Sequence, residues 1–214
     1  MKRTIIPVIL FLSVSTILVA QESIEQYLLE LKRPKVEDYI KLLYEGTHEG
    51  KLLAVSKLRE MNAEGEEVVD ALIFGLQQGT MIVQRELNRV VNDFWDVRAQ
   101  SALALGEIGD PRALHDLHIA LTYDPDTIVR SSVAIAIGKV GDPSSIPILS
   151  RTIETATTAG PDDLVVRSCV EALGEIGHRD CFTPLVAVIR GNFRRSIRLA
   201  ALDALKKIKW LEDF

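Results

Sequence analysis

Apolar residues in the middle of the chain recur with the period of an α-helix. Between residues 97 and 190 they fall three, four or seven positions apart, so that they line one face of each predicted helix. The spacing i, i+3, i+7 is clearest in three sets: Leu114, Leu117 and Leu121; Ile146, Leu149 and Ile153; and Phe182, Leu185 and Ile189. This pattern predicts an all-α protein.

Each of these sets follows another helical segment, and the two segments together form a repeat. The first segments of the three clearest repeats are Val97–Pro111, Val129–Pro143 and Val166–Gly177. Their central glycines are 32 and 36 residues apart, at Gly106, Gly138 and Gly174. A period of this length is typical of arrays of short helical units.

Capping residues mark the ends of the helices within a repeat. A glycine ends the first helix at Gly109, where a left-handed cap suits a residue without a side chain. Asp110 and Pro111 follow at once, and they are favoured residues for the N-cap and the first position of a second helix. So short a turn predicts an antiparallel helix pair.

The repeat resembles the HEAT-like repeats of the phycobiliprotein-lyase type, whose consensus is approximately Val-Arg-x-x-Ala-x-x-Ala-Leu-Gly-x-Ile-Gly-Asp-Pro. Residues 97–111 and 129–143 match it almost throughout. Residues 166–182 are one residue shorter before their first glycine and have His178 and Arg179 in place of Asp-Pro, so we expect a slight shift of that hairpin. The resemblance covers about residues 46–210 and implies an α-solenoid, a HEAT-like superhelix of antiparallel helix pairs. It concerns the repeat alone, and we expect no phycobilin lyase activity.

The predicted organisation has three parts. We expect a signal peptide at residues 1–20, N-terminal capping helices within 21–45 (at 24–31 and 36–43), and the HEAT-like repeat domain at 46–214. Its repeats are about 46–78, 97–128, 129–164 and 165–196, with a C-terminal cap at 197–214. Stacked repeats place their second helices side by side, and we expect these to form an extended concave face.

The connection from Leu76 to Val97 is about twelve residues longer than the one from Leu121 to Val129. Its β-branched runs predict a small β-hairpin at about 80–94. It also contains Phe94 and Trp95 in a chain with few aromatic residues. Long insertions between repeats often carry function, so both aromatic residues are candidates for contact with a partner. The alternative is that they only cover the first helix pair.

The N-terminus has the layout of a secretory signal peptide. Lys2 and Arg3 precede an uncharged apolar run from Ile5 to Val19, and a polar segment follows Ala20. The run is shorter than the roughly 20 residues of a membrane span. We therefore expect cleavage after Ala20 and a soluble periplasmic or secreted protein without membrane insertion. An uncleaved N-terminal anchor is the alternative.

Charge argues against nucleic-acid binding. The chain has 25 basic and 30 acidic residues, a formal net charge of −5. Binding to phosphate backbones requires clustered Lys and Arg, and the one basic cluster, at Arg190, Arg194, Arg195 and Arg198, is small. This cluster is either a solvated surface or a contact for an acidic partner or a lipid headgroup.

Other basic residues and the two cysteines have structural explanations. Arg98, Arg130 and Arg198 recur with the repeat, and Arg167 lies one residue out of frame, so we expect a ladder of ion pairs to acidic residues of the adjoining repeat. Cys169 and Cys181 fall at opposite ends of one predicted helix pair. This offset exceeds the reach of a disulfide, and we expect two buried free thiols.

Candidate catalytic groups are few. His115 and His118 lie at i and i+3 on a second helix, where they could share a metal, but the other repeats have no companion ligand at these positions. The paired His-Glu motifs of HEAT-like di-iron hydroxylases are replaced by Ala99-Gln100 and Ser131-Ser132. No nucleophile elbow or phosphate loop is present in the sequence. We expect no cofactor.

These observations favour an exported, non-catalytic scaffold or adaptor that binds another protein. The candidate partner-binding residues are Phe94, Trp95, His115, His118, Arg194 and Arg195. Two alternatives remain: a metal-dependent enzyme on the face around His115 and His118, and a membrane-tethered structural subunit. The sequence defines neither the partner nor the oligomeric state.

Overall fold

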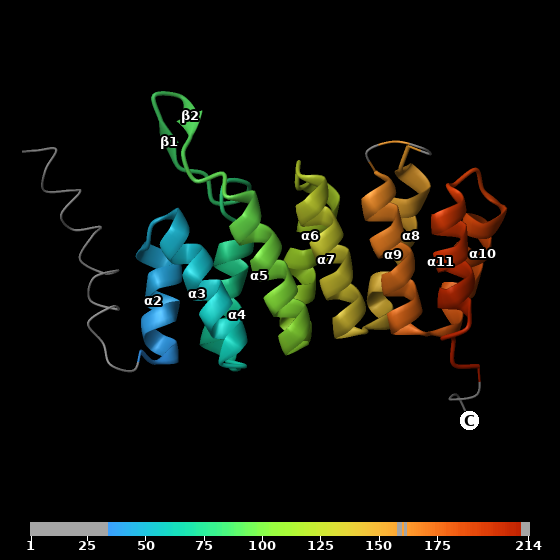
Figure 1. Cartoon of the computed structure of the whole chain (residues 1–214), viewed down its shortest axis with the longest axis horizontal. Coiled ribbons are helices and arrows are strands. Elements are labelled where there is room, and N and C mark those ends of the chain that lie inside the picture. Colours follow the sequence, from blue (N-terminus) through green and yellow to red (C-terminus); the bar gives the residue numbers. More distant parts are fainter. Residues whose placement is uncertain (1–33, 158–159, 161, 211–214) are drawn as a thin grey trace, which may run out of the picture.

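The computed structural model describes residues 34–157, 160 and 162–210 of the chain. Within this part the helices form two layers along one array, from α2 at one end to α10 and α11 at the other (Figure 1). The elements are α2 (Val36–Glu45), α3 (His48–Glu60), α4 (Glu66–Leu76), β1 (Arg85–Glu86), β2 (Arg89–Val90), α5 (Trp95–Ile108), η1 (Pro111–Ala113), α6 (Leu114–Tyr123), α7 (Thr127–Val140), η2 (Pro143–Ser145), α8 (Ile146–Thr155), α9 (Asp163–Ile176), η3 (Arg179–Cys181), α10 (Phe182–Arg190) and α11 (Arg195–Leu205).

Some predicted segments lie outside the described residues. These are the signal peptide at 1–20 and the helix at 24–31. The helix predicted at 36–43 corresponds to α2, and α3 with α4 forms the weaker first repeat. In the described ranges, no helix has both the length and the hydrophobicity of a membrane span.

The turns within the repeats have the predicted caps. Gly109, Gly141 and Gly177 adopt left-handed backbone angles, with φ of 72°, 75° and 64°. Asp110 then accepts a hydrogen bond from the backbone N–H of Arg112 at 2.9 Å. The second helix begins with one 3-10 turn before it becomes α-helical, a detail that the sequence did not predict. The α-solenoid fold of antiparallel helix pairs is confirmed.

The third turn keeps this form although its sequence departs from the consensus. His178 replaces the capping aspartate, and its Nδ1 accepts a hydrogen bond from the backbone N–H of Asp180 at 3.2 Å. The 3-10 turn Arg179–Cys181 follows, as in the other repeats. An imidazole nitrogen therefore performs the role of the carboxylate oxygen.

The first helices of successive repeats approach each other closely through small residues. A Cβ atom added to Gly106 would lie 2.5 Å from Cα of Ala136, and one added to Gly138 would lie 2.7 Å from Cα of Ala172. Gly174 has the same relation to Ala204, at 2.9 Å. We call α5, α7, α9 and α11 the first-helix layer.

The most extensive packing between repeats lies in the first-helix layer, between α5, α7 and α9. The backbones of the second helices α6 and α8 approach each other less closely. Glycine at positions 106, 138 and 174 allows the first helices to pack this tightly. The extended concave face of second helices stays a prediction.

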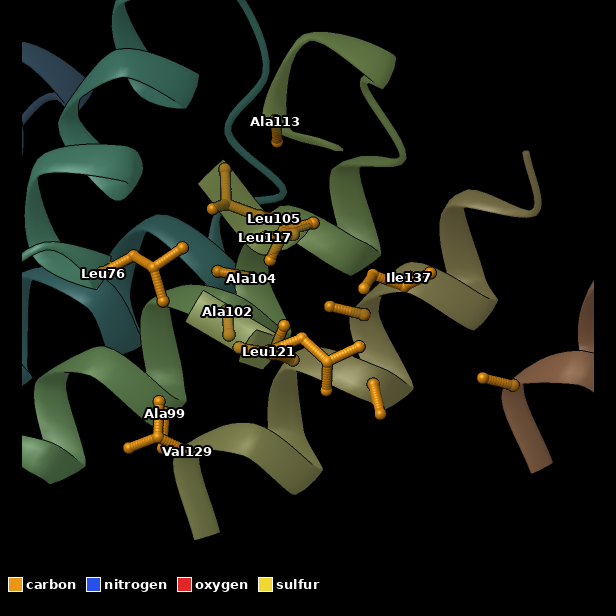
Figure 2. Packing of buried hydrophobic residues seen from close by; sticks show 14 of the residues in the cluster. Leu76, Ala99, Ala102, Ala104, Leu105, Ala113, Leu117, Leu121, Val129 and Ile137 are labelled. Carbon is orange, nitrogen blue, oxygen red and sulfur yellow. The ribbon is translucent and has the colours of Figure 1, made fainter. Parts of the chain in front are cut away.

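The core runs along the array between the two layers. Figure 2 shows labelled side chains of α5, α6 and α7 gathered in one cluster, among them Leu105, Leu117 and Ile137. Cys169 and Cys181 are both buried and free, as predicted. Burial raises the pKa of the Cys169 thiol to about 12 and that of Cys181 to about 11, so neither thiol is reactive at neutral pH.

Candidate functional site

The insertion between α4 and α5 projects from one edge of the array (Figure 1). Its predicted β-hairpin is present but short, with two residues in each strand. The strands pair antiparallel, with Arg85 opposite Val90 and Glu86 opposite Arg89. An isolated hairpin of this length is not stable in water, so its position depends on how its base is held.

A buried arginine holds the base of the insertion. The side chain of Arg98, in α5, is 1% exposed. Its Nη1 donates to the carbonyl oxygen of Gln78 at 3.0 Å and to the Asp93 carboxylate at 2.6 Å. Its Nε donates to the carboxylate of Asp124 at 2.8 Å. One guanidinium thus joins the start of the insertion, its end, and the loop before the next repeat.

The charge of Arg98 is maintained in this site. Burial by itself would lower the pKa of Arg98, but the hydrogen bonds to Asp93 and Asp124 outweigh burial and raise this pKa above its ordinary value. The Asp124 side chain is as deeply buried as the arginine. Neither charge has access to water, so each depends on the other for its stability.

Asn92 and Gly79 bring the two stems of the insertion together. The Asn92 side chain, almost fully buried, donates to the carbonyl oxygen of Ile82 at 2.7 Å and accepts from the backbone N–H of Gln84 at 2.8 Å. Gly79 has φ of +74°, and a Cβ there would lie 2.6 Å from Cα of Asp93. The backbones of the two stems approach each other so closely here that only glycine fits at position 79.

The tip of the hairpin is strained and apolar. The two turn residues, Leu87 and Asn88, both have positive φ, 47° and 66°. Asparagine tolerates this conformation, whereas leucine in it is disfavoured by roughly 1–2 kcal/mol. Leu87 is also 100% exposed. Its position is therefore unfavourable both for the backbone and for hydration.

Further apolar side chains are exposed beside the tip. Together with Leu87 they form what we call the hairpin surface, made of Met81, Val83, Leu87, Val90 and Val91. Several exposed apolar residues within one short insertion mark an interaction site more often than isolated ones do. The sequence analysis placed the candidate site on the aromatic residues instead and missed these five side chains.

The two aromatic residues at the end of the insertion have different environments. Phe94 packs against the core and stacks on the His48 ring, with ring centroids 4.4 Å apart. The Nε2 atom of His48 lies 2.7 Å from a carboxylate oxygen of Asp96. Trp95 remains largely exposed at the start of α5. Phe94 therefore covers the first helix pair, and only Trp95 is available to a partner.

A groove of about 360 Å³ lies at the base of the hairpin surface, between the insertion and α6. Met81 lies on the insertion side, and Ile119 and Tyr123 lie on the α6 side. The side-chain amide of Gln77 donates to the Asp116 carboxylate at 2.7 Å across it. The groove thus extends the exposed apolar surface from the hairpin onto a second helix.

His115 and His118 do not contribute to the hairpin surface. His118 forms a 2.8 Å hydrogen bond with the hydroxyl of Ser145, which joins α6 to η2. Burial lowers the pKa of His118, and the charge of the exposed His115 lowers it further. In the part of the chain that the structure describes, no three His, Cys, Asp or Glu side chains are grouped closely enough to hold a metal ion.

Arg194 and Arg195 lie at the far end of the array, next to the start of α11 (Figure 1). Arg194 forms an ion pair with Asp163 at 2.5 Å. Arg195 is exposed. The candidate residues from the sequence therefore fall in three separate places, and the fold does not combine them into one site.

Two of the predicted ion pairs between a repeat arginine and an acidic residue are present in the described part of the chain. Arg98 pairs with Asp124, and Arg130 approaches Asp162 at 3.6 Å in the equivalent loop of the next repeat. Arg167 pairs with Glu171 four residues later in its own helix. Arg198 is exposed and has no ion pair with any described residue, so the prediction is wrong for this position.

Comparison with known proteins agrees with this architecture. A model of HEAT repeats matches residues 86–160, and a model of the PBS lyase HEAT-like repeat matches residues 165–191. Residues 86–191 therefore contain HEAT repeats, and the repeat at 165–191 is of the PBS lyase type. No curated protein matches it in sequence.

One solved structure shows the same fold. It is the complex of CpcE and CpcF of phycocyanin lyase from Nostoc sp. PCC7120, to which this chain is similar with a TM-score of 0.65 and 22% sequence identity. The match covers 84% of this chain and 67% of the other. At this identity the similarity establishes the fold alone.

Proposed function

We propose that this protein is an exported, non-catalytic scaffold that binds another protein through the hairpin surface. The observation that carries the proposal is the exposed, strained Leu87 at the tip of a hairpin whose base is fixed by Arg98. Strain at an exposed position persists when the residue serves a purpose that stability does not explain. A leucine that inserts into a pocket of a partner is such a purpose.

The rigid base supports this function. A binding loop that is already ordered loses less conformational entropy when its partner binds. Asn92, Gly79 and Arg98 hold both stems, so the apolar tip is presented in one orientation. The similar solved structure is itself a protein complex, of CpcE with CpcF, so this fold takes part in protein–protein association in that case.

Site-specific photocrosslinking in the native cell tests the proposal. The crosslinking amino acid is placed at Leu87, and in a matched control at Leu53, an exposed leucine on α3 outside the hairpin surface. We expect one defined adduct from position 87 and none from position 53. The same adducts from both positions, or none from position 87, would count against the hairpin surface.

A substitution at the hairpin tip tests whether the Leu87 side chain contacts the partner or only affects the stability of the hairpin. Leu87→Gly relieves the backbone strain, so it should stabilise the hairpin, yet it removes the side chain proposed to enter the partner. We expect capture from a crosslinker at Met81 to fall at least tenfold in this variant. Capture that stays the same or rises would show that Leu87 is not a contact residue.

Export is a separate part of the proposal and rests on the N-terminal sequence. Lys2, Arg3 and the apolar run that ends before Ala20 have the layout of a signal peptide. N-terminal sequencing of the protein from the envelope fraction should begin at Gln21. A chain that retains Met1 and stays with the membranes would support the alternative of a tethered subunit.

A further inference from the structure

The last helix of the array exposes a second face that the protein-binding proposal does not use. The core face of α11 is formed by Ile197, Ala201 and Ala204. On the opposite side lie Arg195, Leu199, Leu202 and Lys206, at spacings of three or four residues. Leu199 is 49% exposed and Leu202 is 44% exposed. We call these four residues the α11 end face.

In the other repeats this face is an interface between helices. The repeat spacing aligns Leu199, Leu202 and Lys206 with Ser131, Ala134 and Gly138 of α7. Those three residues are buried, and Gly138 faces Ala172 of α9. The same positions in α11 carry long side chains and are exposed, and α11 lies at one end of the array (Figure 1).

Another repeat cannot stack on the α11 end face in the same way. Close approach of α7 to α9 requires the glycine, since a Cβ at position 138 would already lie 2.7 Å from Cα of Ala172. Lys206 stands at the equivalent place in α11. A second copy of this chain or a further HEAT-like helix pair could therefore not approach α11 as closely as α9 approaches α7.

Charge is concentrated at the same end of the molecule. Residues 177–210 contain eight basic and two acidic side chains, a formal charge of +6, in a chain with a net charge of −5. Residues 34–76 contain five basic and nine acidic side chains, a formal charge of −4. The array is thus polarised along its long axis, with its positive end at α11.

Several of these cations are not neutralised by neighbours. Arg195, Arg198 and Arg190 form no ion pair with any residue in the described part of the chain. Lys206 pairs only with Asp203, three residues away on the solvent side of its own helix. Positive charge at this end is therefore available to an external anion.

An exposed aromatic pair lies beyond the C-terminal end of α11. Trp210 is 61% exposed and meets the ring of Phe182 edge-on, with centroids 5.5 Å apart. Tryptophan is favoured at the level of lipid headgroups, where its ring contacts both apolar and polar groups. Exposed leucine and tryptophan side chains together with several basic residues are features of protein surfaces that contact an anionic bilayer.

We infer that the α11 end face binds the surface of an anionic lipid bilayer, with Leu199, Leu202 and Trp210 among the headgroups and the basic residues on the lipid phosphates. In the row that forms the α11 end face, the two leucines are central and one basic residue lies at either end. The formal charge of +6 at this end of the chain favours an anionic surface as the occupant. The contact is peripheral and leaves the hairpin surface free.

Vesicle sedimentation of the protein as it is isolated from the envelope fraction tests this inference, because the apolar N-terminal segment of an uncleaved chain would itself bind vesicles. The probes are vesicles of phosphatidylcholine alone and vesicles of equal parts phosphatidylcholine and phosphatidylglycerol. We expect stronger binding to the second, decreasing as sodium chloride is added, because screening weakens the attraction of basic residues to an anionic surface. Equal binding to both kinds of vesicle would overturn the inference, and so would binding to neither, which would leave an acidic protein as the occupant.

Variants locate the contact. A basic residue near an anionic membrane contributes about a fivefold factor in affinity, so Arg195→Gln with Arg198→Gln should weaken binding about thirtyfold. Leu199→Ser with Leu202→Ser should weaken it about tenfold or more through lost apolar contact. The matched control is Arg85→Gln with Arg89→Gln, the same charge change on the hairpin, which should have little effect. An equal loss in the control would mean that only net charge matters.

The two tryptophans of the chain give an independent readout. In Trp95→Phe the remaining Trp210 should shift its fluorescence to the blue when phosphatidylglycerol vesicles are added. In Trp210→Phe the remaining Trp95 should not shift. The reverse result would overturn the inference, because it would place the membrane contact at the hairpin end of the array.

Discussion

The junction between α4 and α5 and the junction between α6 and α7 both connect the second helix of one repeat to the first helix of the next. Different interactions fix their geometry. At the second, three residues connect the helices, and Asp126 caps α7 by accepting from the backbone N–H of Ile128 at 2.7 Å. Gly106 of the preceding first helix then packs on the Ala136 backbone. Local sequence therefore determines the regular junction.

At the first junction, eighteen residues separate the helices, and interactions between distant residues determine the geometry. Arg98 joins Gln78, Asp93 and Asp124, which come from three segments of the chain. The contact of Gly75 with α5 is to the hydroxyl of Ser101, not to backbone. The comparison shows that a polar network can replace close backbone packing where a repeat array must accommodate an insertion.

The largest effect on stability is expected from removing the Arg98 guanidinium, which holds the insertion junction. Arg98→Met leaves the buried Asp124 carboxylate without its cation, and breaking a buried pair in this way destabilises a protein by about 3–5 kcal/mol. Chemical denaturation should show a loss of that size. Arg130→Met is the matched control one repeat later; its ion pair is longer and partly exposed, and we expect a loss of at most about 1 kcal/mol. Equal losses would show that Arg98 is not the special residue of the insertion junction.

The second test concerns the regular junction. Gly106→Ala places a Cβ 2.5 Å from Cα of Ala136, so one helix must move. We expect a loss of about 1–3 kcal/mol in the free energy of unfolding, although alanine is otherwise favoured in helices. Ile135→Ala, at an exposed position of α7, should change stability by less than about 0.5 kcal/mol. A stabilising effect of Gly106→Ala would contradict the close approach of the first helices.

A smaller effect is expected at the hairpin tip. Leu87→Gly removes left-handed strain of roughly 1 kcal/mol, which acts on the hairpin and not on the array. Hydrogen exchange should report it at the backbone N–H of Val91, which donates to the carbonyl oxygen of Gln84 at 3.0 Å. We expect protection there to rise about fivefold without a change in the melting temperature of the array. Lower protection would mean that the Leu87 side chain stabilises the hairpin.

The smallest effect is a pH dependence at the contact between α6 and η2. The folded-state pKa of His118 lies below its ordinary value, because of burial first and the charge of His115 second, with Asp142 acting against both. As pH falls below about 6.5, the unfolded chain takes up a proton that the folded chain does not, so stability decreases until pH passes the folded-state pKa. The melting temperature should fall less steeply with decreasing pH in His118→Gln. An unchanged slope would assign the pH dependence to other groups.

Sequence and structure agree best where the determinants are local. The glycine caps, the capping aspartates and the helical spacing of the leucines predicted the repeats correctly. The exposure of Arg198 and its lack of an ion pair with any described residue were not predictable in this way. They depend on which side of a helix meets a neighbour, and a repeat motif carries no information on that.

The candidate sites illustrate the same division. Composition drew attention to Phe94 and Trp95, yet packing places one in the core and leaves the other exposed. The positive φ of Leu87, a residue without any turn preference, left no signal in the sequence. The alternation of leucine and arginine in α11 was visible, but its exposure follows only from the position of this helix in the row.

The sequence by itself determined that this protein is an array of antiparallel helix pairs, because caps, turns and helix periodicity act over a few residues. Only the tertiary structure decided how the repeats pack and which surfaces remain open. The first helices pack closely because a glycine in one contacts an alanine in the next. The base of the hairpin is held because Arg98 forms ion pairs with carboxylates from two loops. Such contacts join residues far apart in the chain, so they exist only once the fold has formed.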